Sequence, residues 1–219
     1  MIYKANISNE EVQKLPLFSF KGEVVIVDNI EIYNKIKDEL FLETIWGFDT
    51  ETKPCFKKGL ANNTPVSLLQ LSSAEKTYLF RLNKLELQKE VVNILSSPKY
   101  LKVGVSIHDD LKALKKLKNF NPQSFIELQD YVKEFDIEEM SLKKIAAIVL
   151  NLRVSKAQQL SNWAAEELNE KQIATAKKLL EAICLTFDIK RSKGHRDMKS
   201  TDCPGDVAYR QLKKEGIIW

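Results

Sequence analysis

The chain has 219 residues, of which 44% are hydrophobic, so it can bury a full core, and its few scattered glycines and prolines exclude low-complexity linkers. No apolar run is long enough to cross a bilayer, and the N-terminus lacks the apolar core of a signal peptide. We therefore expect a cytoplasmic protein without membrane contact. The net charge of +4 is only a weak indication of a polyanionic partner.

Cysteine and histidine usage limits the chemistry that the chain can perform. The three cysteines, Cys55, Cys184 and Cys203, form no pair with metal-binding or redox spacing, and their odd number suits a reducing compartment. Only two histidines are present, His108 and His195, which excludes a histidine-rich zinc site. Any metal must therefore be held mainly by oxygen atoms.

The first half of the chain predicts several strands and one helix. Periodicity and turn residues indicate a strand at 23–28, a helix at 29–41, a strand at 44–51, and two further strands at 66–71 and 76–80. The helix begins at an Asn-type cap, and the first strand is expected at an edge of the sheet. A short serine-rich turn separates the last two strands, which is typical of a hairpin.

The second half of the chain alternates between helices and strands. The elements expected there are a helix at 85–95, a strand at 100–105, a helix at 109–117, a strand at 124–131, and helices at 141–152 and 169–187. Three neighbouring strands joined by tight turns, followed by strands alternating with helices, predict an α/β fold with a mixed sheet covered by helices.

Two acids stand at the end of the strand at 44–51. Asp49 and Glu51 are two residues apart, and because side chains on a strand alternate between its faces, both carboxylates project to the same side. Two like charges held together repel unless a cation lies between them, and carboxylate oxygens are the ligands that Mg²⁺ or Mn²⁺ prefers. The alternative for an isolated Asp-x-Glu is a strand end that turns into solvent with two hydrated acids.

A second acidic element, Asp109-Asp110, follows the strand at 100–105 within a few residues. A carboxylate in the first turn of the next helix points over the end of the sheet, which is the edge where Asp49 and Glu51 are expected. The simpler interpretation is that acids such as Asp109 complement the helix dipole. His108 is expected to form local hydrogen bonds rather than to bind metal.

Three stretches of the sequence carry a longer pattern. Residues 46–82 contain Phe-Asp-x-Glu, then Pro and Gly, and then Leu-Leu-Gln-Leu; residues 102–114 contain the second acidic element, and residues 160–172 contain Leu-Ser-Asn-Trp. In this order and with these gaps, they resemble the 3′→5′ exonuclease domains of the DEDD superfamily (DEDDy type), in particular the branch of the Werner-syndrome-protein exonuclease and ribonuclease D. The likeness covers residues 20–172, roughly, and is more specific than Asp-x-Glu alone.

The resemblance implies a ribonuclease H-like mixed sheet, with antiparallel first three strands, then parallel strands, and a helical cover. It implies 3′→5′ hydrolysis of terminal phosphodiesters at DNA or RNA 3′ ends by two Mg²⁺ or Mn²⁺ ions about 4 Å apart. Asp49, Glu51 and Asp110 match three of the four acids of the family, so these three residues are the expected catalytic and metal-binding residues.

The third motif of the family is not matched. Its water-orienting tyrosine would fall on Thr175 and its aspartate on Leu179, and neither side chain can take these roles. The nearby acid Glu181 would serve only if the helix slid or turned, since it is displaced by about 200° around a helix from position 179. Two interpretations stay open: divergence into a weak or inactive nuclease, or a frameshift in the C-terminal stretch. We therefore expect an exonuclease-like domain at 1–188 and a divergent basic tail at 189–219.

An alternative function follows from this mismatch. The chain is then a catalytically impaired nucleic-acid-binding module on the same fold, and a protein-interaction domain is a more remote third interpretation. The basic run at 190–196 suits contact with a nucleic-acid backbone, but a solvated tail is the simpler interpretation. Trp163 is expected to be a packing residue rather than a platform for base stacking.

Overall fold

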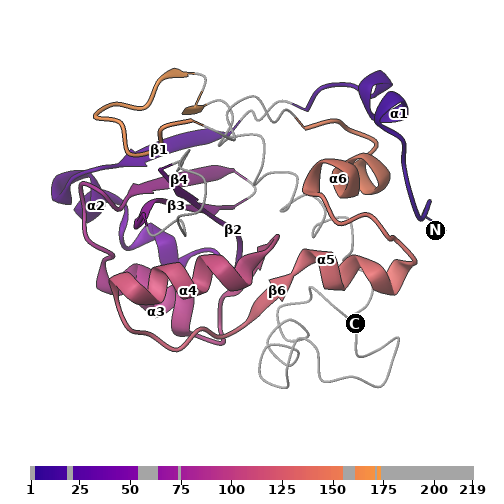
Figure 1. Cartoon of the computed structure of the whole chain (residues 1–219). Coiled ribbons are helices and arrows are strands. Elements are labelled where there is room, and N and C mark those ends of the chain that lie inside the picture. The colour runs from indigo at the N-terminus through magenta and orange to yellow at the C-terminus, as the bar shows by residue number, and fades with distance from the viewer. Residues whose placement is uncertain are drawn as a thin grey trace.

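A six-stranded mixed sheet organises the part of the chain that the computed structural model describes, which comprises residues 3–18, 22–53, 64–73, 75–154, 161–170 and 172–173 (Figure 1). Its strands, in chain order, are β1 (Glu23–Val27), β2 (Ile45–Thr52), β3 (Val66–Ser72), β4 (Lys76–Arg81), β5 (Leu101–Gly104) and β6 (Phe125–Glu127). Their order across the sheet is β1-β4-β3-β2-β5-β6.

Helices and short 3₁₀ turns connect and cover these strands. They are α1 (Asn9–Lys14), α2 (Ile30–Ile36), η1 (Glu39–Phe41), α3 (Lys89–Ser96), α4 (Ile107–Leu117), α5 (Leu128–Tyr131), η2 (Val132–Phe135) and α6 (Leu142–Leu150). Within the described ranges, no helix has both the length and the apolar character that a membrane span requires.

The pairing of the strands confirms the mixed sheet. β2, β3 and β4 are antiparallel neighbours, and β3 and β4 form the expected hairpin. β1 runs parallel to β4 at one edge of the sheet, while β5 and β6 run parallel to β2 on the other side. β1 is therefore an edge strand, as its sequence predicts.

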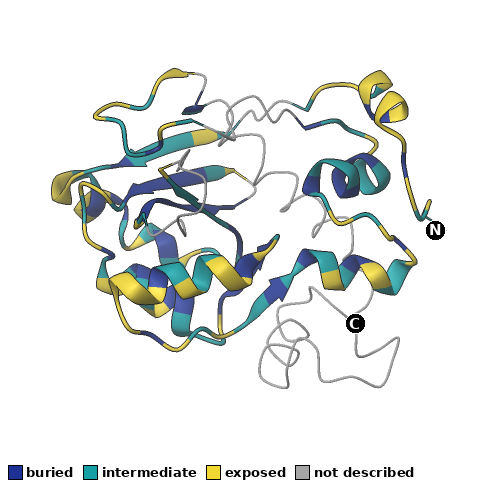
Figure 2. Ribbon diagram, in the orientation of Figure 1, coloured by how far each residue is buried: buried dark blue, intermediate teal, exposed yellow. Residues whose placement is uncertain are grey.

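Side-chain alternation divides the core between the two faces of the sheet. Trp46 and Phe48 of β2 lie on the face that packs against α2, α3 and α4, together with apolar side chains of β3 and β4. The opposite face packs in two parts: Leu101 and Val103 of β5 contact α6, whereas Leu68 of β3 contacts the segment 161–170. The strands β3, β4 and β5 are almost entirely buried, whereas Figure 2 shows that the outer side of α4 is exposed.

Two helices are clearly shorter than their predicted extents. The helix predicted at 29–41 begins at its Asn29 cap but stops at Ile36, and a separate 3₁₀ turn follows. The helix predicted at 85–95 begins only at Lys89, because the carbonyl of Arg81 first accepts hydrogen bonds from the amides of Lys84 and Leu85 in a turn. These boundaries depend on turn geometry that hydrophobic periodicity does not report.

The strand predicted at 124–131 is the clearest correction. It ends at Glu127, and residues 128–131 form the helix α5. The carboxylate of Glu127 accepts a hydrogen bond from the amide of Gln129, 3.2 Å away, so the side chain of the last strand residue begins the helix. A helix cap supplied by glutamate is uncommon, and the β-forming residues of this stretch predict a longer strand instead of a helix start.

Lys102 is a fully buried lysine in the middle of β5, below the end of α3. Its ammonium donates to the carbonyl oxygens of Ile94 (2.8 Å), Ser97 (3.1 Å) and Tyr100 (2.7 Å), and it lies 4.9 Å from the ring centre of Phe125. It thereby satisfies acceptors at the C-terminal end of α3, where a cation is favoured. Burial lowers the pKa of Lys102 to about 7, whereas the three carbonyl oxygens favour its charged form.

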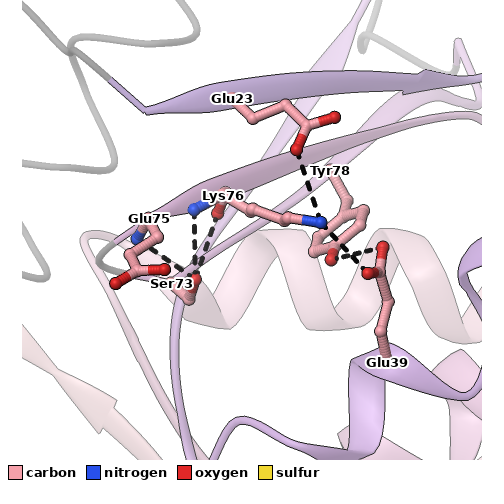
Figure 3. Close-up of polar contacts among 6 residues, drawn as sticks. All are labelled: Glu23, Glu39, Ser73, Glu75, Lys76 and Tyr78. Carbon is pink, nitrogen blue, oxygen red and sulfur yellow. Dashed lines mark hydrogen bonds and ion pairs between the residues drawn. The ribbon is translucent and has the colours of Figure 1, made fainter.

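A second polar cluster joins η1 to the β1–β4 edge of the sheet (Figure 3). Glu39 accepts hydrogen bonds from the hydroxyl of Tyr78 (2.8 Å) and from the ammonium of Lys76 (3.1 Å), and Lys76 also lies 3.3 Å from Glu23 of β1. Because Lys76 and Glu23 are exposed or nearly so, these ion pairs contribute little free energy each. Their effect is to fix the position of η1, directly before β2.

We predict that Lys102→Met lowers the free energy of unfolding by about 2–4 kcal/mol, because three buried carbonyl oxygens lose their donor. Chemical denaturation monitored by circular dichroism measures this change. Lys99→Met, which alters an exposed neighbour, is the control and is expected to stay within about 0.5 kcal/mol of the wild type. Equal stability of the two variants would contradict the role assigned to Lys102.

Candidate metal centre

β2 extends beyond its neighbour β5, and the expected site lies along this extension. β5 pairs only with the residues from Ile45 to Gly47, so Asp49 and Glu51 lie past the end of β5. The chain leaves β5 at Gly104 and enters α4, which contacts β2. The β5–α4 turn thus brings a second acidic segment to the unpaired edge of β2.

Gly104 permits the close approach of α4 to β2. A Cβ atom at this position would lie 2.7 Å from the carbonyl oxygen of Phe48 and would also collide with the side chain of Ile107. Any larger residue would push the start of α4 away from β2. The glycine is therefore required by packing between the strand that carries Asp49 and the helix that carries Asp110.

The three predicted acids approach this edge from both faces of the sheet. The β2–β3 register places Asp49 opposite Gln70 and Glu51 opposite Leu68, on the face opposite to Phe48. Thr50 points to the other face, where its hydroxyl donates a hydrogen bond of 2.5 Å to Oδ1 of Asp110 on α4. Asp109, in contrast, is exposed, and this agrees with the simpler interpretation given to that residue.

Burial and mutual repulsion make this cluster unfavourable when it is fully charged. Burial, followed by the charges of Glu51 and Asp110, raises the pKa of Asp49 well above its usual range. Burial and the charge of Asp110 raise the pKa of Glu51 to about 8, and burial raises that of Asp110 to about 6 although the hydroxyl of Thr50 opposes the shift. A bound cation would oppose these shifts, because it favours the charged form of each carboxylate.

The donor set fits a hard divalent cation in its chemistry. It consists of carboxylate oxygens without thiolate or imidazole ligands, which is the set preferred by Mg²⁺ and Mn²⁺. Across the described residues, however, no three or more His, Cys, Asp or Glu side chains already surround one common metal position. Asp110 is turned towards Thr50, so its carboxylate would have to rotate to share an ion with Asp49 and Glu51.

Gln70 is a polar residue beside the site that the sequence did not single out as functional. It is fully buried directly across from Asp49, and neither its amide nitrogen nor its amide oxygen has a hydrogen-bond partner among the described residues. A buried amide without partners costs free energy. Thr50 was also missed, because a threonine between two strand acids carries no signal of its own.

The segment leading to the third motif is anchored on β4. Trp163 packs on Leu68 and Leu79, as expected for a packing residue. The guanidinium of Arg81 donates to the carbonyl of Ala165, and Lys84 forms a 2.8 Å ion pair with Glu166.

A reciprocal cap then begins the next helix. Oδ1 of Asn169 accepts from the amide of Gln172, and Oε1 of Gln172 accepts from the amide of Asn169, both at 3.0 Å. Thr175, Leu179 and Glu181 lie outside the described residues, as does the tail predicted at 189–219.

A model of the 3′–5′ exonuclease family matches residues 24–178, which is more than half of the chain. The chain therefore belongs to this DEDD-type 3′–5′ exonuclease family, and its six-stranded mixed sheet is the ribonuclease H-like fold that the family motifs predict.

Individual relatives agree with this assignment. The chain is 27% identical over 190 residues to the exonuclease mut-7 homolog of Aedes aegypti, a match that covers 75% of this chain and 26% of that protein. It thus spans about a quarter of the length of this relative.

Two solved structures share the fold. The EXO domain of Aedes aegypti Nibbler superposes with a TM-score of 0.68 at 20% identity, covering 90% of this chain and 94% of that one. The RNase D of Trypanosoma brucei in complex with RNA U12 gives 0.68 at 18% identity, covering 98% of this chain and 73% of that one.

We predict that stability without metal falls as pH rises from about 5 to 8. The folded-state pKa values of Glu51 (about 8) and Asp110 (about 6) lie above their usual values, so over this range the folded state binds more protons than the unfolded state and is favoured at the lower pH. Excess Mg²⁺ or Mn²⁺ is expected to raise the melting temperature most at pH 8. Denaturation with EDTA or metal at several pH values measures both effects.

Glu51→Gln tests the source of this pH dependence. It is expected to stabilise the metal-free protein at pH 8 by about 1–3 kcal/mol and to reduce the stabilisation by metal. Glu10→Gln, at an exposed acid on α1, is the matched control and should change neither property. A metal-free stability that is independent of pH would contradict the arrangement of the three acids.

Gln70→Met gives a separate prediction. Replacing an unpaired buried amide by an apolar side chain of similar length is expected to raise the free energy of unfolding by about 1–2 kcal/mol. The control Gln129→Met removes a hydrogen bond to the carbonyl of Met140 and is expected to be neutral or destabilising. A clear loss of stability in Gln70→Met would mean that the amide has a partner.

Proposed function

We propose that the chain is a metal-dependent 3′→5′ exonuclease that hydrolyses terminal phosphodiesters of DNA or RNA by a two-metal-ion mechanism, with Asp49, Glu51 and Asp110 as metal ligands. The observation that carries this proposal is the convergence of three partly buried carboxylates at the unpaired edge of β2. Membership in a 3′–5′ exonuclease family supports the same activity.

In this proposal, the three acids act as metal ligands and Thr50 contacts one of them. Asp49 and Glu51 present two carboxylates from a rigid central strand, and Asp110 supplies a third from the first turn of α4. Bound Mg²⁺ or Mn²⁺ would lower the pKa of the attacking water and stabilise the leaving 3′ oxygen. The hydroxyl of Thr50 donates to one oxygen of Asp110, and the Asp110 carboxylate would rotate away from Thr50 to share an ion with the β2 acids.

RNA is the first substrate class to test. One structural relative, the RNase D of Trypanosoma brucei, has been crystallised in complex with RNA U12. DNA is tested alongside RNA, because the acids at the site would act on the phosphodiester and would not distinguish ribose from deoxyribose.

A catalytically impaired nucleic-acid-binding module is the second candidate. It is favoured by Thr175 and Leu179, which occupy the places of the family's tyrosine and aspartate. Such a protein would still present Asp49, Glu51 and Asp110 to metal and would retain nucleic acid without shortening it.

The two candidates differ in a simple assay. Purified protein is incubated with 5′-labelled single-stranded RNA or DNA of the same sequence, with Mg²⁺, Mn²⁺ or EDTA. The proposal predicts stepwise shortening from the 3′ end that requires metal, and a loss of about 100-fold or more in Asp49→Asn. Phosphorothioate linkages at the 3′ end should slow the reaction.

The controls separate the remaining outcomes. Equal shortening by wild type and Asp49→Asn would identify a contaminating nuclease. Binding at low salt without shortening would support the impaired module, and absence of binding would contradict both candidates and favour a protein-interaction domain.

A further inference from the structure

A single carboxylate holds the turn that precedes the Asp110 helix. Glu127 is the last residue of β6 and lies beside Gly104 in the parallel β5–β6 pairing. Its Oε2 accepts from the amide of Ile107 at 2.9 Å, and its Oε1 accepts from the amides of Ser106 at 3.0 Å and Gln129 at 3.2 Å. One side chain thus joins the starts of α4 and α5.

The α4 terminus has no cap of its own. Ser106 occupies the N-cap position with φ of 60°, in the left-handed region, and its side chain forms no capping hydrogen bond. The first amides of a helix need an acceptor from elsewhere, and a serine in this backbone conformation is strained. Glu127 supplies the acceptor and stabilises the strained residue through its amide.

Asp110 depends on the position of this terminus. It lies four residues after Ser106, in the first turn of α4, and is bonded there to Thr50 of β2. A first turn that loses its acceptor frays or shifts, and a displacement of about 1 Å is enough to disturb a catalytic arrangement. The contact between Asp110 and Thr50 of β2 therefore relies on the hydrogen bonds of Glu127.

We propose that Glu127 is the positioning residue of the metal centre: by fixing the β5–α4 turn, it holds Asp110 against β2 so that Asp110 can share a metal ion with Asp49 and Glu51. This inference rests on the proposed function. Glu127 does not act as a ligand itself, because both its oxygens already accept backbone hydrogen bonds. Its negative charge also contributes to the raised pKa of Asp110, which places the two carboxylates near each other.

The experiment measures binding of Mn²⁺ alone, by the loss of the electron paramagnetic resonance signal of free Mn²⁺, for the whole chain and its variants. Glu127→Ala is expected to weaken Mn²⁺ binding about 10–100-fold. Glu127→Gln retains one acceptor oxygen but turns an NH₂ group towards a backbone amide, so an intermediate loss is expected. Circular dichroism checks that each variant is folded.

A matched control separates positioning from general destabilisation. Glu139 also accepts a backbone hydrogen bond, from the amide of Ile7 at 3.3 Å, and pairs with Lys144 at 2.6 Å. Glu139→Ala is expected to lower the melting temperature without changing Mn²⁺ affinity. Unchanged affinity in folded Glu127→Ala would overturn the proposal, and if that variant does not fold, unchanged affinity in Glu127→Gln would do so.

Failure of this inference is distinguishable from failure of the proposed function. A wild-type protein that binds Mn²⁺ but shortens no nucleic acid contradicts the proposed activity, and the Glu127 variants still decide the positioning role. A wild-type protein that binds no Mn²⁺ overturns the metal centre and the role of Glu127 together.

Discussion

The pairing of β5 with only the first part of β2 is the constraint on which the site depends. Parallel pairing stops after Gly47, and the chain turns from β5 into α4 instead of continuing along β2. The rest of β2 therefore has β3 on one side and the start of α4 on the other, so the carboxylates of Asp49 and Glu51 remain within reach of a helix. A longer β5 would occupy this edge of β2 with backbone pairing and keep the start of α4 away from it.

Polar side chains maintain this geometry on either side of β5. Lys102 donates to carbonyl oxygens at the C-terminal end of α3, and Glu127 accepts from the first amides of α4, so charged groups fix the chain that enters β5 and the chain that leaves it. Each satisfies backbone atoms that a helix end would otherwise leave unpaired. The remaining cost is concentrated at the three acids, whose pKa values are raised first by burial and then by neighbouring negative charges; a cation would offset this cost.

Local sequence patterns were sufficient for the elements that carry the acids. The β-branched run before Asp49, the serine-rich turn of the β3–β4 hairpin and the helical spacing after Asp110 each determine their own structure, and all three are confirmed. The choice of Asp110 over Asp109 came from the family resemblance, since both lie in one helical turn. In the structure, Asp110 contacts Thr50 of β2, whereas Asp109 is exposed.

Features that depend on distant contacts were not predictable in this way. In the sequence, Glu127 is an ordinary strand residue, and its role follows only from the pairing of β6 with β5. Lys102 has the sequence signal of a surface residue, and its burial follows only from the packing of α3 against β5. The carboxylates near the end of β2 and the turn at Gly104 were each predictable from the sequence. The distance between these carboxylates and the turn was not. The places of Thr175 and Leu179 are outside the described residues, so the mismatch in the third motif rests on the sequence.

Anomalous scattering from crystals soaked in Mn²⁺ would locate the metal relative to the three acids. We expect at least one Mn²⁺ peak coordinated by Asp49 and Glu51, with the carboxylate of Asp110 turned from Thr50 towards the same ion. A second peak nearby would support the two-ion mechanism. Crystals saturated with Mn²⁺ that show no peak beside these three carboxylates would contradict the account.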